Sequence, residues 1–372
     1  MRILLSGLGR DVYPTGVSRV AANHAIALVT DRVTDHVVLT IGSWQRDLYR
    51  MLLVHSEASI ELAIVSIKNS SVSRNLWFAE ELPRLAQHYG ADIVHHSFPA
   101  PVIRRLFPCP VVVTMHDFYP YDMPENFGFP RYYANRLILR QCVGSVDGIA
   151  CVSNSTMRRL HELFPNVTNK IPVEVTGNYI RISKVTPIAP GVLGGLKMKS
   201  FILAVAQHRK NKNLKLLIRG YAELLKSGKY QFPLVIVGAQ GPETAALTQL
   251  TESLGIVEEV RFMYSVADEE LSWLYTNCSL FVACSSIEGY CLPVAEALIN
   301  HAKVVCSDIG ILRDVGGEQC NYFSLEGNII QNITAAIMAS LEQPIGTNHP
   351  IDRFSEKNVL AAYVKLYSRV LH

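Results

Sequence analysis

Residues 279–296 read SLFVACSSIEGYCLPVAE, and this stretch decides the fold of the second half of the chain. Its first part, 279–284, is a short apolar run with polar residues beside it, as expected for a buried strand of a parallel sheet. Gly289 allows backbone angles that other residues avoid, and Pro293 has the fixed dihedral angle and missing N–H that suit the start of a helix. The stretch therefore predicts a strand, a turn and a helix that begins near Pro293.

The turn in this stretch is a candidate anion site. The free amides of Tyr290, Cys291 and Leu292 would lie at the positive end of the predicted helix, where a diphosphate binds without a metal ion. Glu288 lies before these amides and Glu296 lies one turn into the helix, so the two carboxylates can bind sugar hydroxyls on either side of the phosphates. The alternative is an ordinary helix start in which both glutamates only cap the helix and contact solvent.

Seven residues separate Glu288 from Glu296, and this spacing resembles the E-x7-E signature of the retaining glycosyltransferases of family 4. The resemblance extends over most of the chain. It implies the GT-B fold, an α/β architecture in which two doubly wound, Rossmann-like domains face a central cleft and the C-terminal helix returns to the N-terminal domain. The family commonly has glycine where Cys291 stands, and small residues where His301 and Lys303 stand.

The composition fits a two-domain protein. With 372 residues, of which 49% are hydrophobic, the chain is too long for one ordinary core. The net charge of +3 argues against nucleic acid as the principal partner. The eight cysteines include no C-x-x-C pair, so we expect reduced structural thiols. The apolar N-terminal stretch is too short for a signal peptide, and no segment is long enough to span a membrane. We therefore expect a cytoplasmic protein, at most peripheral on the inner face of a membrane.

Short apolar segments alternate with amphipathic stretches twice along the chain, which is typical of two doubly wound sheets. Strands are predicted at 2–5, 36–40, 63–65, 93–96, 111–115 and 148–152, and then at 201–205, 234–237, 260–263, 280–283 and 303–306. Residues 187–195 are rich in Pro and Gly and uncharged, which predicts a linker. We expect an acceptor-side domain over 1–186, completed by an amphipathic helix over 355–372, and a nucleotide-sugar-binding domain over 187–354.

Three cations stand within four residues at Arg209, Lys210 and Lys212, after a predicted strand and before a predicted helix. Transfer from a nucleotide sugar releases a diphosphate, whose charge is best stabilised by cations that are fixed beforehand. The segment is similar to the phosphate-binding Arg/Lys segment of the family, and that register makes Lys212 the diphosphate lysine and Arg209 its partner. The alternative is a solvated basic turn. Since the sequence has no Asp-x-Asp triplet, we expect no bound metal and no cofactor besides the donor.

In the N-terminal half, His116 and Asp117 end a strongly apolar strand, where open α/β sheets bind ligands. The pair matches the His-Asp of the family, whose histidine contacts the donor sugar, and the alternative is a structural histidine. His95 and His96 end the preceding strand and are candidates for the acceptor side. Gly16 opens the first long helix and would let its loop approach the donor phosphate or the acceptor.

Several turn residues add weaker signals. Gly7 and Gly9 follow the first strand, but the third glycine of a dinucleotide fingerprint is missing, so a tight turn explains them equally well. Residues 153–156 are capping residues by type and are predicted to be structural. Gly238 resembles the strand-loop glycine near the nucleotide, and 264–271 matches the loop whose backbone contacts the base.

Together these features favour a retaining hexosyltransferase, and the resemblance to the family implies that the leaving phosphate accepts the proton of the incoming hydroxyl. Residues 208–214 and the context of His116 look most like bacterial polysaccharide mannosyltransferases. That resemblance implies GDP-mannose as donor, with UDP-sugars and other hexoses open, and a glycan or polyprenol-linked glycan as acceptor. Two alternatives remain, a nucleotide-sugar 2-epimerase on the same fold and a non-catalytic module that binds nucleotide sugars.

Membrane contact is predicted from two places where aromatic and basic residues adjoin. Trp77 and Phe78 stand near Arg74, and Phe107 follows two arginines at 104–105. Such groups can touch a membrane that carries a lipid-linked glycan. The alternative is that Trp77 and Phe107 are core residues, which their burial tendencies favour.

Overall fold

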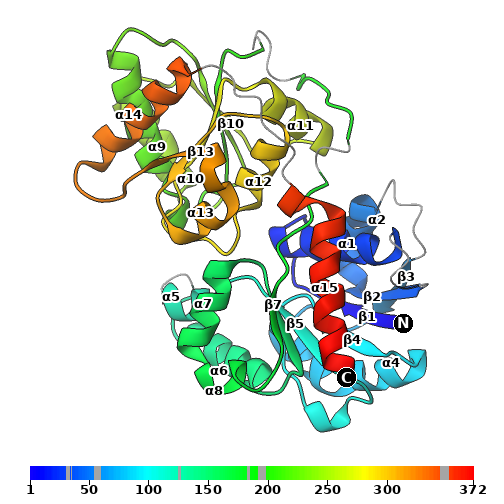
Figure 1. Cartoon of the computed structure of the whole chain (residues 1–372). Helices are drawn as coiled ribbons and strands as arrows, with labels where there is room; N and C mark the ends of the chain where they lie inside the picture. The colour runs from blue at the N-terminus through cyan, green and yellow to red at the C-terminus, as the bar shows by residue number, and fades with distance from the viewer. Residues whose placement is uncertain are drawn as a thin grey trace. The chain divides into compact units, whose positions relative to one another are not determined.

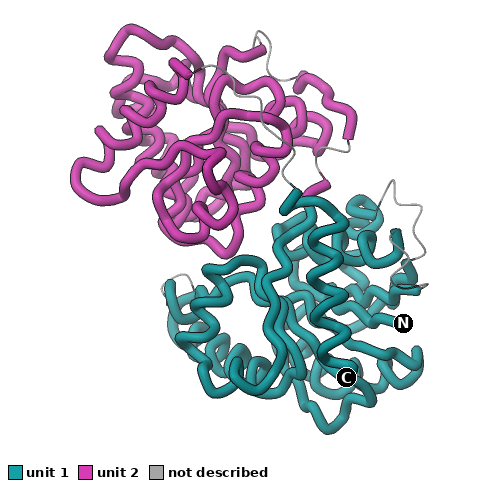
Figure 2. Tube along the Cα trace, viewed as in Figure 1, with its two compact units in different colours: residues 1–179, 352–372 teal, residues 180–351 magenta. Residues whose placement is uncertain are grey.

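The computed structural model describes residues 1–30, 34, 36–53, 60–124, 127–181, 185–191, 198–343 and 352–372. Two compact units divide the chain, Met1–Tyr179 with Asp352–His372, and Ile180–Ile351 (Figure 2). The first unit therefore ends before residue 186, where the sequence placed the boundary. The beginning of the predicted linker belongs to the second unit, because the Ile188 amide donates to the Glu269 carbonyl at 3.1 Å. Residues 192–195 of that linker lie outside the described residues.

The first unit is built on a seven-stranded parallel sheet with the order β3-β2-β1-β4-β5-β6-β7. The strands are β1 (Arg2–Ser6), β2 (His36–Gly42), β3 (Ile60–Val65), β4 (Ile93–His96), β5 (Val111–Met115), β6 (Gly148–Cys151) and β7 (Val173–Val175). The helices are α1 (Gly16–Thr30), α2 (Arg46–Leu53), α3 (Ser71–Leu76), α4 (Leu82–Tyr89), α5 (Tyr119–Asp122), α6 (Arg131–Val143), α7 (Asn154–Leu163), α8 (Pro165–Thr168) and α15 (Glu356–Leu371). Figure 1 labels most of them on the ribbon.

The second unit has a six-stranded parallel sheet with the order β10-β9-β8-β11-β12-β13. The strands are β8 (Ile202–Val205), β9 (Leu234–Val237), β10 (Val260–Met263), β11 (Leu280–Ala283), β12 (Val304–Ser307) and β13 (Cys320–Phe323). The helices are α9 (Leu214–Lys226), α10 (Thr244–Ser253), α11 (Asp268–Asn277), α12 (Leu292–Ile299), α13 (Gly310–Gly316) and α14 (Ile329–Glu342).

The prediction of two doubly wound α/β halves is confirmed, and each predicted strand is present with small changes at its ends. Two strands were missed, β7 and β13. Both lie at an edge of their sheet. Their sequences, Val-Glu-Val and Cys-Asn-Tyr-Phe, are short and contain polar residues, because an edge strand is buried less completely than a central one.

The predicted return of the C-terminal helix is also confirmed. Helix α15, drawn red in Figure 1, packs with α1 and the sheet of the first unit. The residues with helical spacing that face this core are Val359, Leu360, Tyr363, Leu366 and Tyr367, each at most 4% exposed. They meet strand residues from β1, β4, β5 and β6 in one hydrophobic cluster. The last helix of the chain therefore covers part of one face of the first sheet, beside α1 and α2.

A buried polar network ties α15 to the sheet. The Tyr367 hydroxyl lies 2.6 Å from Nδ1 of His95 and 3.1 Å from Nε2 of His24, and the Thr114 hydroxyl lies 2.7 Å from Nε2 of His95. The ring of His24 also stacks on that of Tyr363, with 3.9 Å between centroids. Burial lowers the pKa of His24 to about 3 and holds that of His95 well below its usual range. Both rings are therefore neutral in the folded protein.

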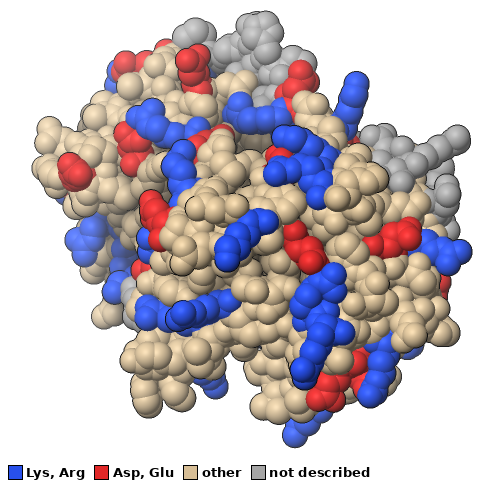
Figure 3. Space-filling view, turned by 60° about the horizontal axis from the view of Figure 1, so that its bottom comes forward, with Lys and Arg blue, Asp and Glu red and all other residues tan. Residues whose placement is uncertain are grey.

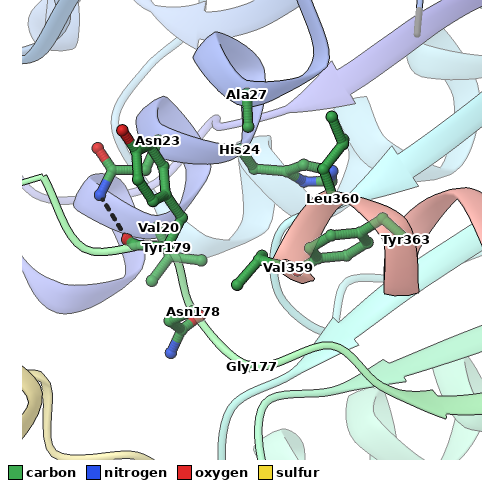
Figure 4. A pocket seen from close by; sticks show the side chains of 10 residues that line it. All are labelled: Val20, Asn23, His24, Ala27, Gly177, Asn178, Tyr179, Val359, Leu360 and Tyr363. Carbon is green, nitrogen blue, oxygen red and sulfur yellow. Dashed lines mark hydrogen bonds between the residues drawn. The ribbon is translucent and has the colours of Figure 1, made fainter. Parts of the chain in front are cut away.

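The segment that leaves the first unit is fastened to α1. The Asn23 side chain donates to the Tyr179 carbonyl at 3.0 Å, and Gly177 has a φ of +66°, which favours glycine. Side chains of α1 and α15 line a small pocket together with residues 177–179 (Figure 4). This pocket marks the place where the chain leaves the first unit.

Candidate active site

The helix predicted near Pro293 is α12, which begins at Leu292 and has proline as its second residue. The turn before it departs from the prediction at one point. Gly289, which is a described residue, has no positive φ. Cys291 has one, with φ 68° and ψ 66°. The left-handed conformation is thus required at the position where the family commonly has glycine. A residue with a side chain is about 1 to 2 kcal/mol less stable in this conformation.

Glu288 lies in an ion pair with Lys212. The Lys212 ammonium donates to Oε1 of Glu288 at 2.5 Å, and the Ser285 hydroxyl donates to the same oxygen at 2.6 Å. The side chain of Glu288 is 5% exposed and that of Lys212 is 19% exposed. Burial alone would lower the pKa of Lys212, but the Glu288 carboxylate more than offsets this effect and the pKa is raised. Lys212 is therefore a charged group held at a fixed place.

This pairing was not foreseen in the sequence, where Glu288 was assigned only to sugar hydroxyls. The two other cations of the segment differ from Lys212, because Arg209 and Lys210 are both exposed. The guanidinium of Arg209 lies close enough to Lys212 to oppose its positive charge. Arg209 and Lys212 are therefore near enough for their positive charges to interact.

Gly238 has a steric reason for being glycine. A Cβ atom there would lie 1.9 Å from the carbonyl oxygen of Ala206, and one at Gly241 would lie 2.5 Å from that of His208. The two glycines let the turn after β9 pack directly on the backbone after β8, which leads to Lys212. Amides donate across this contact, from Ala206 to the Val237 carbonyl at 2.8 Å and from Glu243 to the His208 carbonyl at 3.0 Å. The basic segment is therefore held by backbone contacts.

Glu296 lies on α12, and its Oε2 accepts a hydrogen bond from the hydroxyl of Tyr275 at 2.8 Å. Tyr275 is fully buried on α11, and burial together with Glu296 holds its pKa well above the usual range, so it stays a donor. Tyr275 cannot be predicted from the sequence, since nothing in the chain marks a tyrosine on a neighbouring helix as the partner of a glutamate.

A second missed residue is His208, whose ring is fully buried beneath the basic segment. Its Nδ1 lies 2.9 Å from the Thr244 hydroxyl, and the rings of Phe262 and Tyr264 meet it edge-on at 5.6 and 5.8 Å. Tyr264 opens the loop that was matched to base contacts, and 40% of it is exposed. The contacts among the rings of His208, Phe262 and Tyr264 hold the start of this loop in place.

In the first unit, His116 follows β5 as predicted and is partly buried. Its Nε2–H donates to the carbonyl of Ser97 at 2.7 Å, so Nδ1 is the acceptor nitrogen of the neutral ring. Burial lowers the pKa of His116, which keeps the ring neutral at pH 7. Asp117 accepts from the amide of Tyr119 at 3.0 Å and so shapes the following turn.

The expectation that His95 and His96 lie on the acceptor side is wrong. Their exposed fractions are 0% and 1%. Because side chains alternate along a strand, His95 faces α15 whereas His96 packs against Phe78 and Phe107 on the other face of the sheet. Neither ring nitrogen of His96 has a hydrogen-bond partner among the described residues, and burial lowers its pKa to about 4.

The predicted membrane residues lie in the core. Trp77, Phe78 and Phe107 are 8%, 2% and 5% exposed, and Arg104 pairs with Asp147 at 2.6 Å. The alternative stated for these aromatic residues is therefore correct. No helix of the part of the chain that the structure describes has both the length and the apolar character needed to cross a membrane.

The glycines near the N-terminus have separate roles. Gly7 lies against Tyr49, whose hydroxyl donates to the Gly7 carbonyl at 3.1 Å, and the amide of Gly9 donates to the Gln45 side chain at 3.0 Å. These contacts account for a tight turn. Gly16 is exposed and is the first residue of α1. At α7, the Ser153 hydroxyl accepts from the Thr156 amide at 3.0 Å, which confirms the predicted cap.

Family models match both units. A model described as "Glycosyltransferase Family 4" matches residues 14–182, and one described as "Glycosyl transferases group 1" matches residues 191–357. The second range holds Lys212, Glu288 and Glu296, and the first holds His116.

Two relatives are named as mannosyltransferases. "O-antigen chain mannosyltransferase B" of Escherichia coli is 27% identical over 62% of this chain, and "O-antigen chain mannosyltransferase RfbU" of Salmonella typhimurium is 24% identical over 59%. The chain spans 61% and 56% of the lengths of these two relatives.

Solved structures share the fold over nearly the whole chain. Alr3699/HepE of Anabaena, in complex with UDP and glucose, has a TM-score of 0.73 at 16% identity and covers 99% of both chains. WaaG, described as a glycosyltransferase involved in lipopolysaccharide biosynthesis, has a TM-score of 0.67 at 16% identity and covers 99% of this chain and 97% of its own. These likenesses concern the fold.

Proposed function

Because the chain belongs to the family 4 glycosyltransferases with the GT-B fold, we propose that it transfers mannose from GDP-mannose to a glycan or polyprenol-linked glycan, with retention of anomeric configuration. The observation that carries this proposal is the Lys212–Glu288 pair, which holds the charged ammonium of Lys212, from the segment before α9, against the turn before α12. The choice of mannose is supported by the names of the two O-antigen relatives.

The proposed chemistry begins with departure of the nucleoside diphosphate. Lys212 and Arg209, with the amides of residues 290–292, would stabilise the negative charge that develops on the leaving group. Fixed groups are effective because they need no reorganisation during the reaction. The leaving phosphate then accepts the proton of the attacking hydroxyl. Glu296, held by Tyr275, would bind a hydroxyl of the donor.

The test is release of nucleoside diphosphate that depends on an added acceptor. GDP-mannose with an O-antigen-type glycan acceptor should give free GDP and a mannosylated product, whose anomeric configuration is read by NMR. An epimerase would instead convert the donor without an acceptor, and a binding module would release no nucleotide. Either outcome would contradict the proposal.

The donor base can be tested by thermal stability. GDP at a hundredfold excess over its dissociation constant should stabilise the protein by about 2.7 kcal/mol, which is several degrees in Tm. UDP, ADP and dTDP serve as comparisons. A rise in Tm with UDP alone would show that the donor is a UDP-sugar and not GDP-mannose. A UDP-sugar is the main alternative donor, since the structure of the Anabaena protein contains UDP.

We expect activity to survive chelation by EDTA, because Lys212, Arg209 and the amides before α12 can supply the positive charge that a divalent ion supplies elsewhere. Among the described residues, no three His, Cys, Asp or Glu side chains are grouped so as to hold a metal ion. Initial rates should be measured with EDTA and then with added magnesium or manganese. Complete loss in EDTA that either metal restores would contradict this expectation.

His116→Ala should lower the transfer rate about tenfold while affinity for the free nucleotide stays nearly constant. The proposed contact of His116 is with the sugar, and one hydrogen bond that strengthens in the transition state corresponds to about 1.4 kcal/mol. Kinetics and nucleotide calorimetry should be compared with those of His88→Ala, which removes an exposed imidazole on α4. Equal losses of rate and nucleotide affinity, or unfolding, would make His116 a structural residue.

Contact with a membrane surface is also proposed, now at α6. Tyr133 and Leu137 lie one turn apart on α6 and are 51% and 68% exposed, and Phe129, which precedes the helix, is 82% exposed. Helix α6 itself contains three arginines and no acidic residue, which suits an anionic lipid surface. Figure 3 shows basic and acidic side chains interspersed with uncharged surface on the face that it draws.

Sedimentation with vesicles of phosphatidylglycerol should therefore capture the protein, and vesicles of phosphatidylcholine should capture less of it. Replacing Phe129 and Leu137 with serine should abolish the difference. The matched control replaces Val72 and Leu76, exposed to 69% and 55% on the first unit, with serine. Equal losses in both double variants would contradict the assignment to α6.

A further inference from the structure

The carboxylate of Glu288 is surrounded by three donors. The Lys212 ammonium and the Ser285 hydroxyl both reach Oε1, at 2.5 and 2.6 Å, and the thiol of Cys291 lies within reach of this carboxylate as a third donor. A carboxylate that is only 5% exposed needs such partners, since a buried charge without them is strongly destabilising. Two of the three donors are neutral and come from the turn that Glu288 itself occupies.

Cys291 makes its contact from a strained backbone. Its φ of +68° lies in the left-handed region, where glycine is the residue of choice and cysteine has no special tolerance. Glycine would remove the strain but would also remove the thiol. A strained residue persists where the surroundings hold it in place, and it often marks a functional constraint.

The thiol remains a donor at neutral pH. Burial and the nearby Glu288 charge hold the pKa of Cys291 well above its usual range, so that the proton stays on sulfur. The side chain is 8% exposed, and its sulfur has the carboxylate as a neighbour rather than solvent.

We propose that Ser285 and Cys291 are positioning residues, which hold the Glu288 carboxylate in the place where it fixes the Lys212 ammonium before a donor binds. The expected effect of these residues on catalysis rests on the glycosyltransferase function proposed above. The physical argument is that a long lysine side chain is effective only if its position is set in advance, and its carboxylate partner can set that position only if the carboxylate is itself held.

The experiment compares Ser285→Ala, Cys291→Ala and Cys291→Ser by kcat, by KM for the donor and by Tm. Loss of either neutral donor should lower kcat about tenfold with a smaller change in KM, and Cys291→Ser should recover most of the loss. Ser286→Ala is the control, because the Ser286 hydroxyl meets a backbone carbonyl, that of Asn211. Wild-type kcat in both alanine variants would overturn the proposal.

A second comparison separates the thiol from the strain. Cys291→Gly and His301→Gly both remove a side chain from a left-handed residue, since His301 has a φ of +58° on the exposed turn after α12. His301→Gly should melt about 2 °C higher than the wild type, whereas in Cys291→Gly the loss of the thiol donor to Glu288 offsets the relief of strain. Only Cys291→Gly should lose activity. Full activity in Cys291→Gly would show that the turn, and not the thiol, is what matters.

A third readout does not depend on sugar transfer. Acylation of the Lys212 amine, followed by peptide mass spectrometry across pH, reports how firmly the ammonium is held. The Ser285→Ala and Cys291→Ala proteins should be labelled about tenfold faster at Lys212 and unchanged at the exposed Lys210. If the wild type transfers no sugar but this difference appears, the proposed function fails and the positioning role stands. Equal labelling of wild type and variants would overturn the positioning role.

Discussion

Lys212→Ala is expected to reduce sugar transfer at least a hundredfold, which corresponds to about 3 kcal/mol of lost transition-state stabilisation. The change removes a cation from the proposed leaving-group site, and it leaves Glu288 buried without its counter-ion. The second effect also destabilises the second unit, because a buried carboxylate that loses its partner is costly. Activity and stability must therefore be measured together.

Two further variants separate these effects. Lys212→Met combined with Glu288→Gln removes both charges, so most of the stability should return while transfer stays impaired. Lys210→Ala removes an exposed cation two residues away and should leave rate and Tm close to those of the wild type. Near wild-type transfer by Lys212→Ala, at unchanged donor affinity, would show that the register of the basic segment is wrong.

Acid should destabilise the first unit well above the pH at which carboxylates titrate. His24 and His96 have pKa values lowered to about 3 and about 4 by burial, and that of His95 is also far below its usual range. In the unfolded chain these rings have an ordinary pKa of about 6.5. Between about pH 6.5 and 4 the unfolded chain binds more protons than the folded one, so stability falls as the pH falls.

Three such groups should lower the free energy of unfolding by about 7 kcal/mol between pH 7 and pH 4.5. Denaturant titrations across this range measure the slope. His96→Leu is the informative variant, because it removes one titrating ring whose nitrogens have no partner among the described residues. It should preserve or raise stability at pH 7 and reduce the slope. A stability that is constant from pH 7 to pH 4.5 would contradict the buried, neutral state of these rings.

The fold was largely predictable because buried parallel strands are uninterrupted apolar runs, and turns and helix starts separate them. β11 and α12 are the clearest case, since the strand, the turn and Pro293 are adjacent in the sequence. β7 and β13 escaped prediction because edge strands need not be uniformly apolar. The division after Tyr179 escaped it as well, because composition marks the Pro- and Gly-rich part of a connection and not the last residue that packs on the first unit.

Residues of the candidate site can be proposed from the sequence, but their contacts cannot. Glu288 and Lys212 were found separately, but 76 positions separate them in the chain and no periodicity relates them. The need for a left-handed residue at position 291 could not be read from a cysteine. His95 and His96 show the same limit, since the end of a strand is visible in a sequence but the face to which each side chain points depends on register.

The packing of α15 on the first sheet has a consequence for synthesis on the ribosome. Residues 1–179 emerge long before α15, so the apolar face around β4, β5 and β6 lacks its cover while the whole second unit is being made. His95 likewise lacks Tyr367 during that time. The second unit has all of its strands in one continuous segment and can fold as soon as it is released, whereas the first must wait for contacts more than 250 residues away, such as that between Tyr367 and His95. We therefore expect the nascent first half to bind chaperones that shield exposed apolar surface.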